Sequence, residues 1–96
     1  MSAKIVIVED EEDLLELIEY TLSKDGFDTV GFLNTKNVSQ LLAEEEIDLL
    51  LMDRNLPGVE ESEFVEQLRK DNIFTPVIFL SAKNSDAEIE EGFMRG

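Results

Sequence analysis

The sequence predicts one α/β domain, built as a doubly wound parallel sheet with helices on both faces. Short apolar runs rich in branched residues alternate with segments of helical spacing, and this alternation requires parallel strands joined by right-handed crossovers. A chain of 96 residues can bury one core but not two, and no linker, repeat or low-complexity tract divides it. The expected domain therefore spans residues 1–96.

Four apolar runs are the expected strands. Residues 5–8, 49–52 and 77–80 are continuous apolar runs, which are typical of strands buried on both faces of a sheet. Residues 29–32 form a shorter and more mixed run that contains Gly31. Glycine inside a strand weakens it, so this run is expected to lie near a sheet edge.

The segments between the strands carry apolar stripes at helical spacing, each opposite a charged face. The stripes are Leu14, Leu15, Ile18 and Leu22; Val38, Leu41 and Leu42; and Phe64, Val65 and Leu68. A last helix is expected from the capping-box pattern at residues 85–88 through Phe93 to Gly96. The predicted order is thus β-α-β-α-β-α-β-α.

Composition narrows the classes of partner and ligand. The 23 acidic and 8 basic residues give a net charge of −15, which makes nucleic acid and anionic lipid poor partners. The chain has no cysteine and no histidine, so a hard cation held by oxygen atoms is the metal site that remains. The four-residue apolar run near the N-terminus is too short for a signal peptide or a membrane span, which predicts a soluble, cytoplasmic protein.

Polar residues follow the expected strands at the edge where ligands of such sheets bind. They are Glu9 and Asp10 after the first strand, Asp53 and Asn55 after the third, and Ser81 after the fourth. If the first and third strands are neighbours, Asp53 lies close to Asp10, and the repulsion between these carboxylates requires a proton or a cation. Mg²⁺ suits such ligands, because it binds through one or two carboxylates, waters and phosphate.

Asp53 is the best-placed nucleophile for a phosphoryl group, and a carboxylate in this role forms an aspartyl phosphate. The hydroxyl of Ser81 would then donate a hydrogen bond to a phosphoryl oxygen. Alternatively, Asp53 is a turn residue before Leu56, although that leaves the opposing acids unexplained, and Ser81 only starts the last connection. The acids at positions 11–13 are interpreted as capping or solvated residues of a helix start.

Three segments together resemble the receiver domain of bacterial two-component response regulators. They are residues 4–11 (Lys-Ile-Val-Ile-Val-Glu-Asp-Glu), 50–58 (Leu-Leu-Met-Asp-Arg-Asn-Leu-Pro-Gly) and 76–82 (Pro-Val-Ile-Phe-Leu-Ser-Ala). The resemblance covers the whole chain and implies a flavodoxin-like sheet of strand order 2-1-3-4. It also implies a phosphorylation-dependent switch that regulates an effector, expected to be a DNA-binding transcription regulator.

The resemblance further assigns roles to the candidate site residues. Asp53 would accept the phosphoryl group from a sensor histidine kinase or a small phosphodonor, and Ser81 would be the switch hydroxyl. Mg²⁺ would be held by Glu9, Asp10 and Asp53 and by the main-chain carbonyl of Asn55. A switch of this kind turns over no substrate beyond its own phosphate, so the chain is not expected to be an enzyme.

The chain also departs from the family pattern. Glu61 stands where the family usually has glycine. The chain ends at Gly96, before the family's fifth strand, phosphate-pairing lysine and last helix. We therefore expect an incomplete receiver domain whose fourth strand is an open edge, prone to dimerisation or strand exchange.

Two other functions stay open at this point. One is an interaction module that responds poorly to phosphorylation. The other is a Mg²⁺-dependent phosphohydrolase, which is less favoured because Asn55 stands where a second acid would be needed.

Overall fold

The computed structural model describes residues 2–54, 56 and 60–80. In chain order its elements are β1 (Lys4–Val8), α1 (Glu12–Lys24), β2 (Asp28–Phe32), α2 (Val38–Glu44), β3 (Leu49–Asp53), α3 (Glu61–Lys70) and β4 (Val77–Leu80). All four predicted strands and the first three predicted helices are confirmed. The helix expected near the C-terminus lies outside the described residues, as do Asn55 and Ser81.

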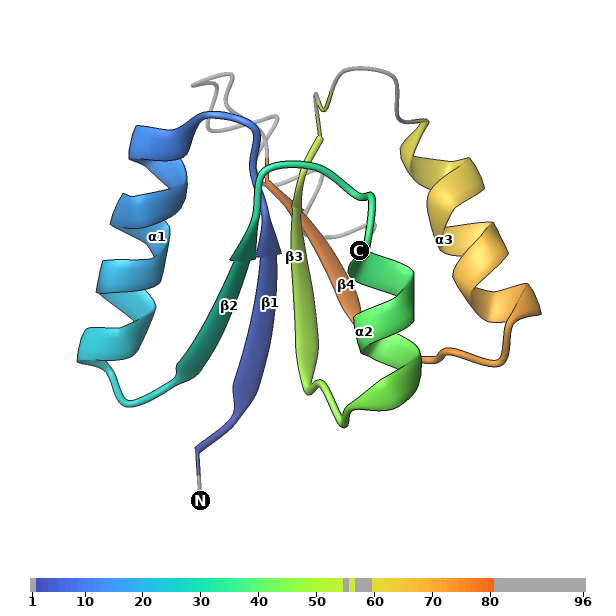
Figure 1. Ribbon diagram of the computed structural model, residues 1–96, viewed down its shortest axis with the longest axis horizontal. Helices are drawn as coiled ribbons and strands as arrows, with labels where there is room; N and C mark the ends of the chain where they lie inside the picture. Colours follow the sequence, from blue (N-terminus) through green and yellow to red (C-terminus); the bar gives the residue numbers. More distant parts are fainter. Residues whose placement is uncertain (1, 55, 57–59, 81–96) are drawn as a thin grey trace.

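The strands form one parallel sheet in the order β2-β1-β3-β4, which confirms the flavodoxin-like order implied by the resemblance (Figure 1). Strand β1 lies between β2 and β3, so the chain crosses β1 on its way from one side of the sheet to the other. A crossing of this kind leaves a crevice at the carboxyl ends of the two neighbouring strands. The fold therefore provides a ligand position beyond the ends of β1 and β3.

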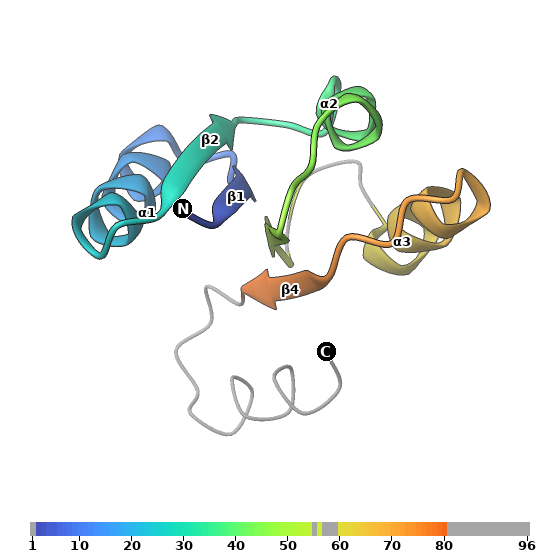
Figure 2. The same cartoon turned by 90° about the horizontal axis from the view of Figure 1, so that it is seen from below.

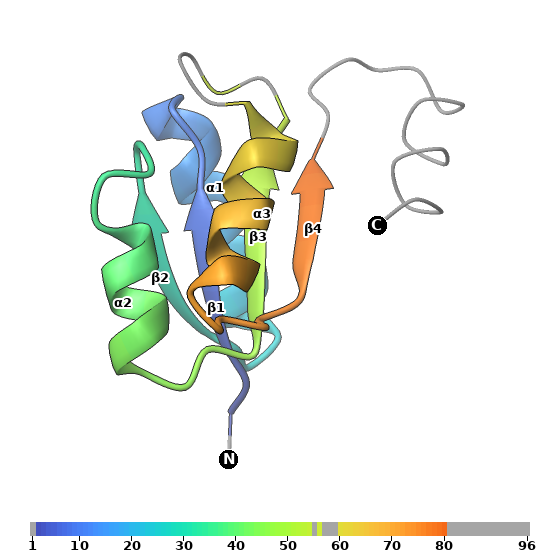
Figure 3. The same cartoon turned by 90° about the vertical axis from the view of Figure 1, so that its right-hand side faces the viewer.

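Helices cover both faces of the sheet, with α1 on one face and α2 and α3 on the other (Figures 2 and 3). Successive side chains of a strand point to opposite faces, so each strand contributes to two cores. Val6 and Val8 pack with Leu68 of α3 in one core, whereas Ile5 and Ile7 pack with the α1 side in the other. Val6, Ile7 and Val8 are wholly buried, which explains why the sequence of β1 is apolar at every position from 5 to 8.

Strand β2 is the least buried of the four and lies at a sheet edge, as predicted. It lies at the end of the sheet, and none of its five residues is buried. A Cβ atom placed on Gly31 would stand 2.8 Å from Oε1 of Glu19 in α1. The absence of a side chain at Gly31 thus lets the Glu19 carboxylate lie directly over the strand.

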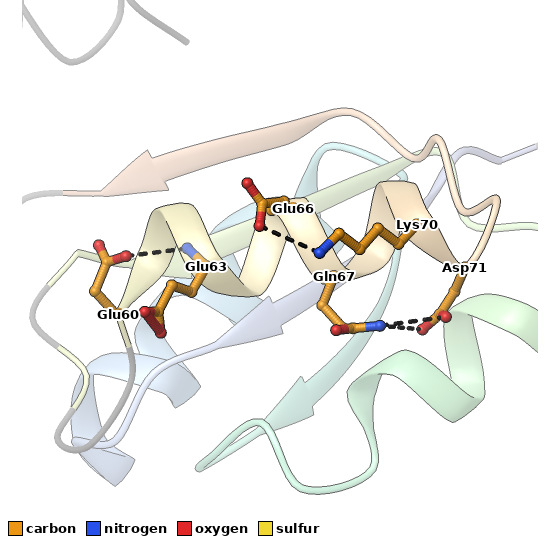
Figure 4. A network of polar contacts seen from close by, with 6 residues as sticks. All are labelled: Glu60, Glu63, Glu66, Gln67, Lys70 and Asp71. Atoms are coloured by element: carbon orange, nitrogen blue, oxygen red, sulfur yellow. Dashed lines mark hydrogen bonds and ion pairs between the residues drawn. The ribbon is translucent and has the colours of Figure 1, made fainter.

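Helix α3 begins with a side-chain cap (Figure 4). The Glu60 carboxylate accepts hydrogen bonds from the backbone N–H groups of Ser62 at 3.3 Å and Glu63 at 3.1 Å. These bonds satisfy N–H groups that have no partner within the helix. The Ser62 hydroxyl also donates to Oε2 of Glu60 at 2.6 Å, and this bond, followed by the two backbone bonds, holds the pKa of Glu60 below its ordinary value. No helix in the described part of the chain is long and apolar enough to cross a membrane.

Candidate functional site

The register of the sheet brings the ends of β1 and β3 together. Val8 pairs with Met52, so the next residue on each strand, Glu9 and Asp53, also lie side by side. The Glu9 N–H donates to the Phe32 carbonyl at 2.9 Å, which extends the pairing of β1 with β2 by one residue. Backbone hydrogen bonds therefore fix where these two carboxylates leave the sheet.

Three carboxylates meet at this point. Glu9, Asp10 and Asp53 each place one oxygen within 4.8 Å of the others. Glu9 and Asp53 are only 3% and 6% exposed, whereas Asp10 faces solvent. The structure thus brings together three of the residues selected from the sequence, and it places Asp53 in a strand rather than in a turn.

The Glu9 carboxyl group is electrostatically unusual. Burial raises its pKa from 4.5 to about 7, and a hydrogen bond with Asp10 and the negative charges of Asp53 and Asp10 act in the same direction. The backbone N–H of Glu11 donates to Oε2 of Glu9 at 3.0 Å and opposes this increase. At neutral pH the cluster is therefore ready to lose a proton when a cation enters.

The donor set fits Mg²⁺. Two oxygens bound to one Mg²⁺ ion at about 2.1 Å lie at most about 4.2 Å apart. The carboxylate oxygens of Glu9, Asp10 and Asp53 lie within 4.8 Å, so a small movement or one bridging water would bring all three to the ion. A hard cation held by carboxylates is also the metal site that the composition favours.

The side chains of the acids that follow Asp10, at positions 11–13, are not part of the cluster. Glu12 and Asp13 are exposed in the first turn of the helix, as the solvated-face interpretation predicts. Glu11 occupies the N-cap position but makes no capping hydrogen bond through its side chain. Its contribution is the backbone N–H that binds Glu9, a role that the sequence analysis missed because no side-chain pattern marks it.

The sequence model of the protein family described as "Response regulator receiver domain" matches residues 5–96 of the chain. The chain belongs to this family. Receiver domains are phosphorylation-dependent signalling switches, not enzymes that turn over a separate substrate. They bind Mg²⁺ through acidic residues, receive their phosphoryl groups from histidine kinases, and usually control an effector.

Solved structures of receiver domains are similar to this one. The receiver domain of the Francisella response regulator 1452 superposes with a TM-score of 0.78 at 28% identity, covering 99% of this chain and 78% of the other. The non-phosphorylated HemR receiver domain of Leptospira biflexa gives a TM-score of 0.75 at 26% identity, covering 99% and 77%.

A third structure, of the response regulator TrrA of Thermotoga maritima in complex with Mg²⁺ and BeF, gives a TM-score of 0.74 at 24% identity. It covers 85% of this chain and 71% of the other. At that identity the likeness supports the shared fold alone.

Proposed function

We propose that this receiver domain accepts a phosphoryl group on Asp53 from a sensor histidine kinase, in a reaction that requires Mg²⁺. The observation that carries the proposal is the position of Asp53. Its carboxylate is almost fully buried at the end of β3, within 4.8 Å of oxygens of Glu9 and Asp10. A buried carboxylate crowded by two further acids is typical of a functional site, because the repulsion between like charges is costly until a cation is bound.

We assign the Mg²⁺ ligands to Glu9, Asp10 and Asp53, together with the main-chain carbonyl of Asn55. The first three are supported by their convergence in the structure. Asn55 lies outside the described residues and is proposed from the family resemblance. When bound, the ion would neutralise the crowded carboxylates and the oxygens of an incoming phosphoryl group.

The covalent bonds that change in the transfer are those of the Asp53 carboxylate and of a phosphohistidine. One oxygen of Asp53 attacks the phosphorus atom, and the bond from phosphorus to the histidine nitrogen breaks. The bonding electron pair returns to that nitrogen, and a ring already protonated on its other nitrogen leaves as neutral imidazole. The product is an aspartyl phosphate, and the protein's contribution is to position and dehydrate the nucleophile.

We further propose that Ser81 donates its hydroxyl to the phosphoryl group and starts the switch, although this residue lies outside the described part. The controlled effector would be a DNA-binding transcription regulator acting in the cytoplasm. The receiver domain itself, with a net charge of −15, would not bind nucleic acid. The DNA-binding output rests on the family resemblance alone.

The test is to incubate the chain with acetyl phosphate and Mg²⁺ and to measure its intact mass. Asp53→Asn removes the proposed nucleophile, and Asp13→Asn, on the exposed start of α1, is the matched control. We expect one added phosphoryl group in the wild type and in Asp13→Asn, none in Asp53→Asn, and none in the wild type with EDTA.

Other outcomes separate the alternatives. An adduct that persists in Asp53→Asn would disprove the site assignment. Steady release of phosphate without an adduct would favour the phosphohydrolase. Bound Mg²⁺ with neither adduct nor phosphate release would favour an interaction module.

A further inference from the structure

Two hollows lie at the amino-terminal edge of the sheet, opposite the carboxylate cluster. The larger, of about 570 Å³, is lined by the loops that precede β3 and β4, including Glu46, Asp48, Asp71 and Phe74. The second, of about 460 Å³, shares Glu46 and Asp48 with the first and adds Asp28. We call the two together the basal groove.

The basal groove combines negative charge with an uncovered aromatic ring. Four of the residues that line the larger hollow are acidic and none is basic: the acids are Glu45, Glu46, Asp48 and Asp71. Phe74 is 69% exposed, although Ile73 beside it is buried. A phenyl ring among carboxylates is a favourable surface for a guanidinium or ammonium group and its aliphatic stem.

The loops around the groove are held in place by hydrogen bonds of the fold itself. Nη1 of Arg69 donates to the carbonyls of Ile73 at 2.9 Å and Thr75 at 3.0 Å, which fixes the loop that carries Phe74. On the other side, the backbone N–H of Lys4 donates to Oδ2 of Asp48 at 2.8 Å. Because both walls are anchored, a ligand would bind with little cost for ordering the loops.

The charges of the groove are only partly compensated by the chain. Nζ of Lys4 lies 2.7 Å from Oε1 of Glu45, and Lys4 is the one base among the residues that line either hollow. Glu46, shared by both hollows, has no ion pair or hydrogen bond with the described residues. A basic ligand would therefore find at least one available carboxylate in the hollow that Phe74 also lines.

We propose that the basal groove binds an extended, basic segment of a partner protein, in which Lys or Arg residues alternate with apolar ones. The basic side chains would meet Glu46 and Asp71, and one of them would lie across Phe74. The carboxyl ends of the strands, with Asp53, are at the opposite edge of the sheet from these loops (Figure 1). Binding at the groove therefore leaves the proposed phosphorylation site open.

The test is a fluorescence anisotropy titration of the full chain with a labelled hexapeptide in which Arg and Leu alternate. Phe74→Ala is compared with the control Tyr20→Ala, because the two residues are 69% and 66% exposed. Glu46→Gln is compared with the control Glu16→Gln, because both glutamates are exposed. We expect Phe74→Ala to weaken binding about fivefold and Glu46→Gln about threefold, with little change in either control. Backbone amide NMR shifts should map to the two groove loops.

Three results would overturn the proposal. The first is no binding at low salt. The second is an equal loss in both members of a matched pair, or amide shifts centred on α1, because either would indicate general attraction to a chain of charge −15. The third is spermine binding as tightly as the peptide, since that would show recognition of charge without the apolar component.

Discussion

Replacing Glu9 with glutamine should stabilise the metal-free protein at pH 8. The pKa of Glu9 is about 7 in the folded protein, whereas an ordinary glutamate, as in the unfolded chain, has a pKa of 4.5. The folded protein therefore binds the Glu9 proton more tightly than the unfolded chain does. Stability linked to this group is therefore lost as pH rises from about 4.5 to about 7. At about 1.4 kcal/mol for each pH unit, the cost of the ionised carboxylate above pH 7 is about 3 kcal/mol.

The measurement is urea unfolding followed by circular dichroism in EDTA, at pH 8 and pH 5. Glutamine keeps the size of Glu9 and an oxygen that can accept the Glu11 N–H, but it carries no charge. Glu9→Gln should therefore be about 3 kcal/mol more stable than the wild type at pH 8, and less than about 1 kcal/mol more stable at pH 5. Glu12→Gln, an exposed acid nearby, is the control for the general effect of removing one negative charge.

Two results would refute this reasoning. A stabilisation by Glu9→Gln that is equal at both pH values would show that the burial of charge is not its cause. An equal gain in Glu12→Gln would show that the overall charge of −15, and not the local cluster, controls the pH dependence.

Three further predictions concern the ion, the core and the glycines. Mg²⁺ at a hundred times its Kd should raise the free energy of unfolding of the wild type by about 2.7 kcal/mol. Asp10→Asn should require more Mg²⁺ for the same gain, and isothermal titration calorimetry would show this as a higher Kd. An unchanged Kd would remove Asp10 from the ligand set. Leu68→Ala, at a buried position, should lower the free energy of unfolding measured in urea by about 3 kcal/mol. Leu17→Ala, on the exposed side of α1, should lower it by less than about 0.5 kcal/mol. Similar losses in the two variants would contradict the packing described for Leu68. Gly26→Ala should lower the thermal midpoint of unfolding, because the backbone φ of Gly26 is +94°. Gly31→Ala should change the midpoint little, since the atoms nearest to a new Cβ belong to the flexible end of Glu19. A larger loss at Gly31 would mean that Glu19 cannot move aside.

The strands and helices could be predicted because local patterns and tertiary packing agree. The runs at residues 5–8 and 49–52 are apolar at every position, and the sheet indeed covers both of their faces. The neighbouring positions of β1 and β3 could not be derived from these runs, because several strand orders satisfy the same pattern. The order came from the family resemblance, and with it came the expectation that Asp10 and Asp53 converge.

The details of the site depend on geometry that residue types do not encode. The sequence marked Glu9 and Asp10 alike, but the strand continues through the Glu9 N–H and buries Glu9 while Asp10 faces solvent. The hydrogen bond from the Glu11 backbone is equally independent of residue type. The cap of α3 was not foreseen either, because Glu60 is not one of the residue types that usually cap a helix through the side chain.

The two edges of the sheet show why burial, and not the number of acids, determines which carboxylates carry chemistry. At the amino-terminal edge, Glu46 and Asp48 are exposed to water and open to charged ligands from solution. At the carboxyl edge, Glu9 and Asp53 are almost fully buried within 4.8 Å of each other, and burial raises the pKa of Glu9, so its negative charge is costly until a cation arrives. The first arrangement suits reversible attraction of a basic partner, and the second suits an ion and a phosphoryl group. A chain with 23 acids can thus hold two different kinds of acidic surface, provided that the sheet buries one of them.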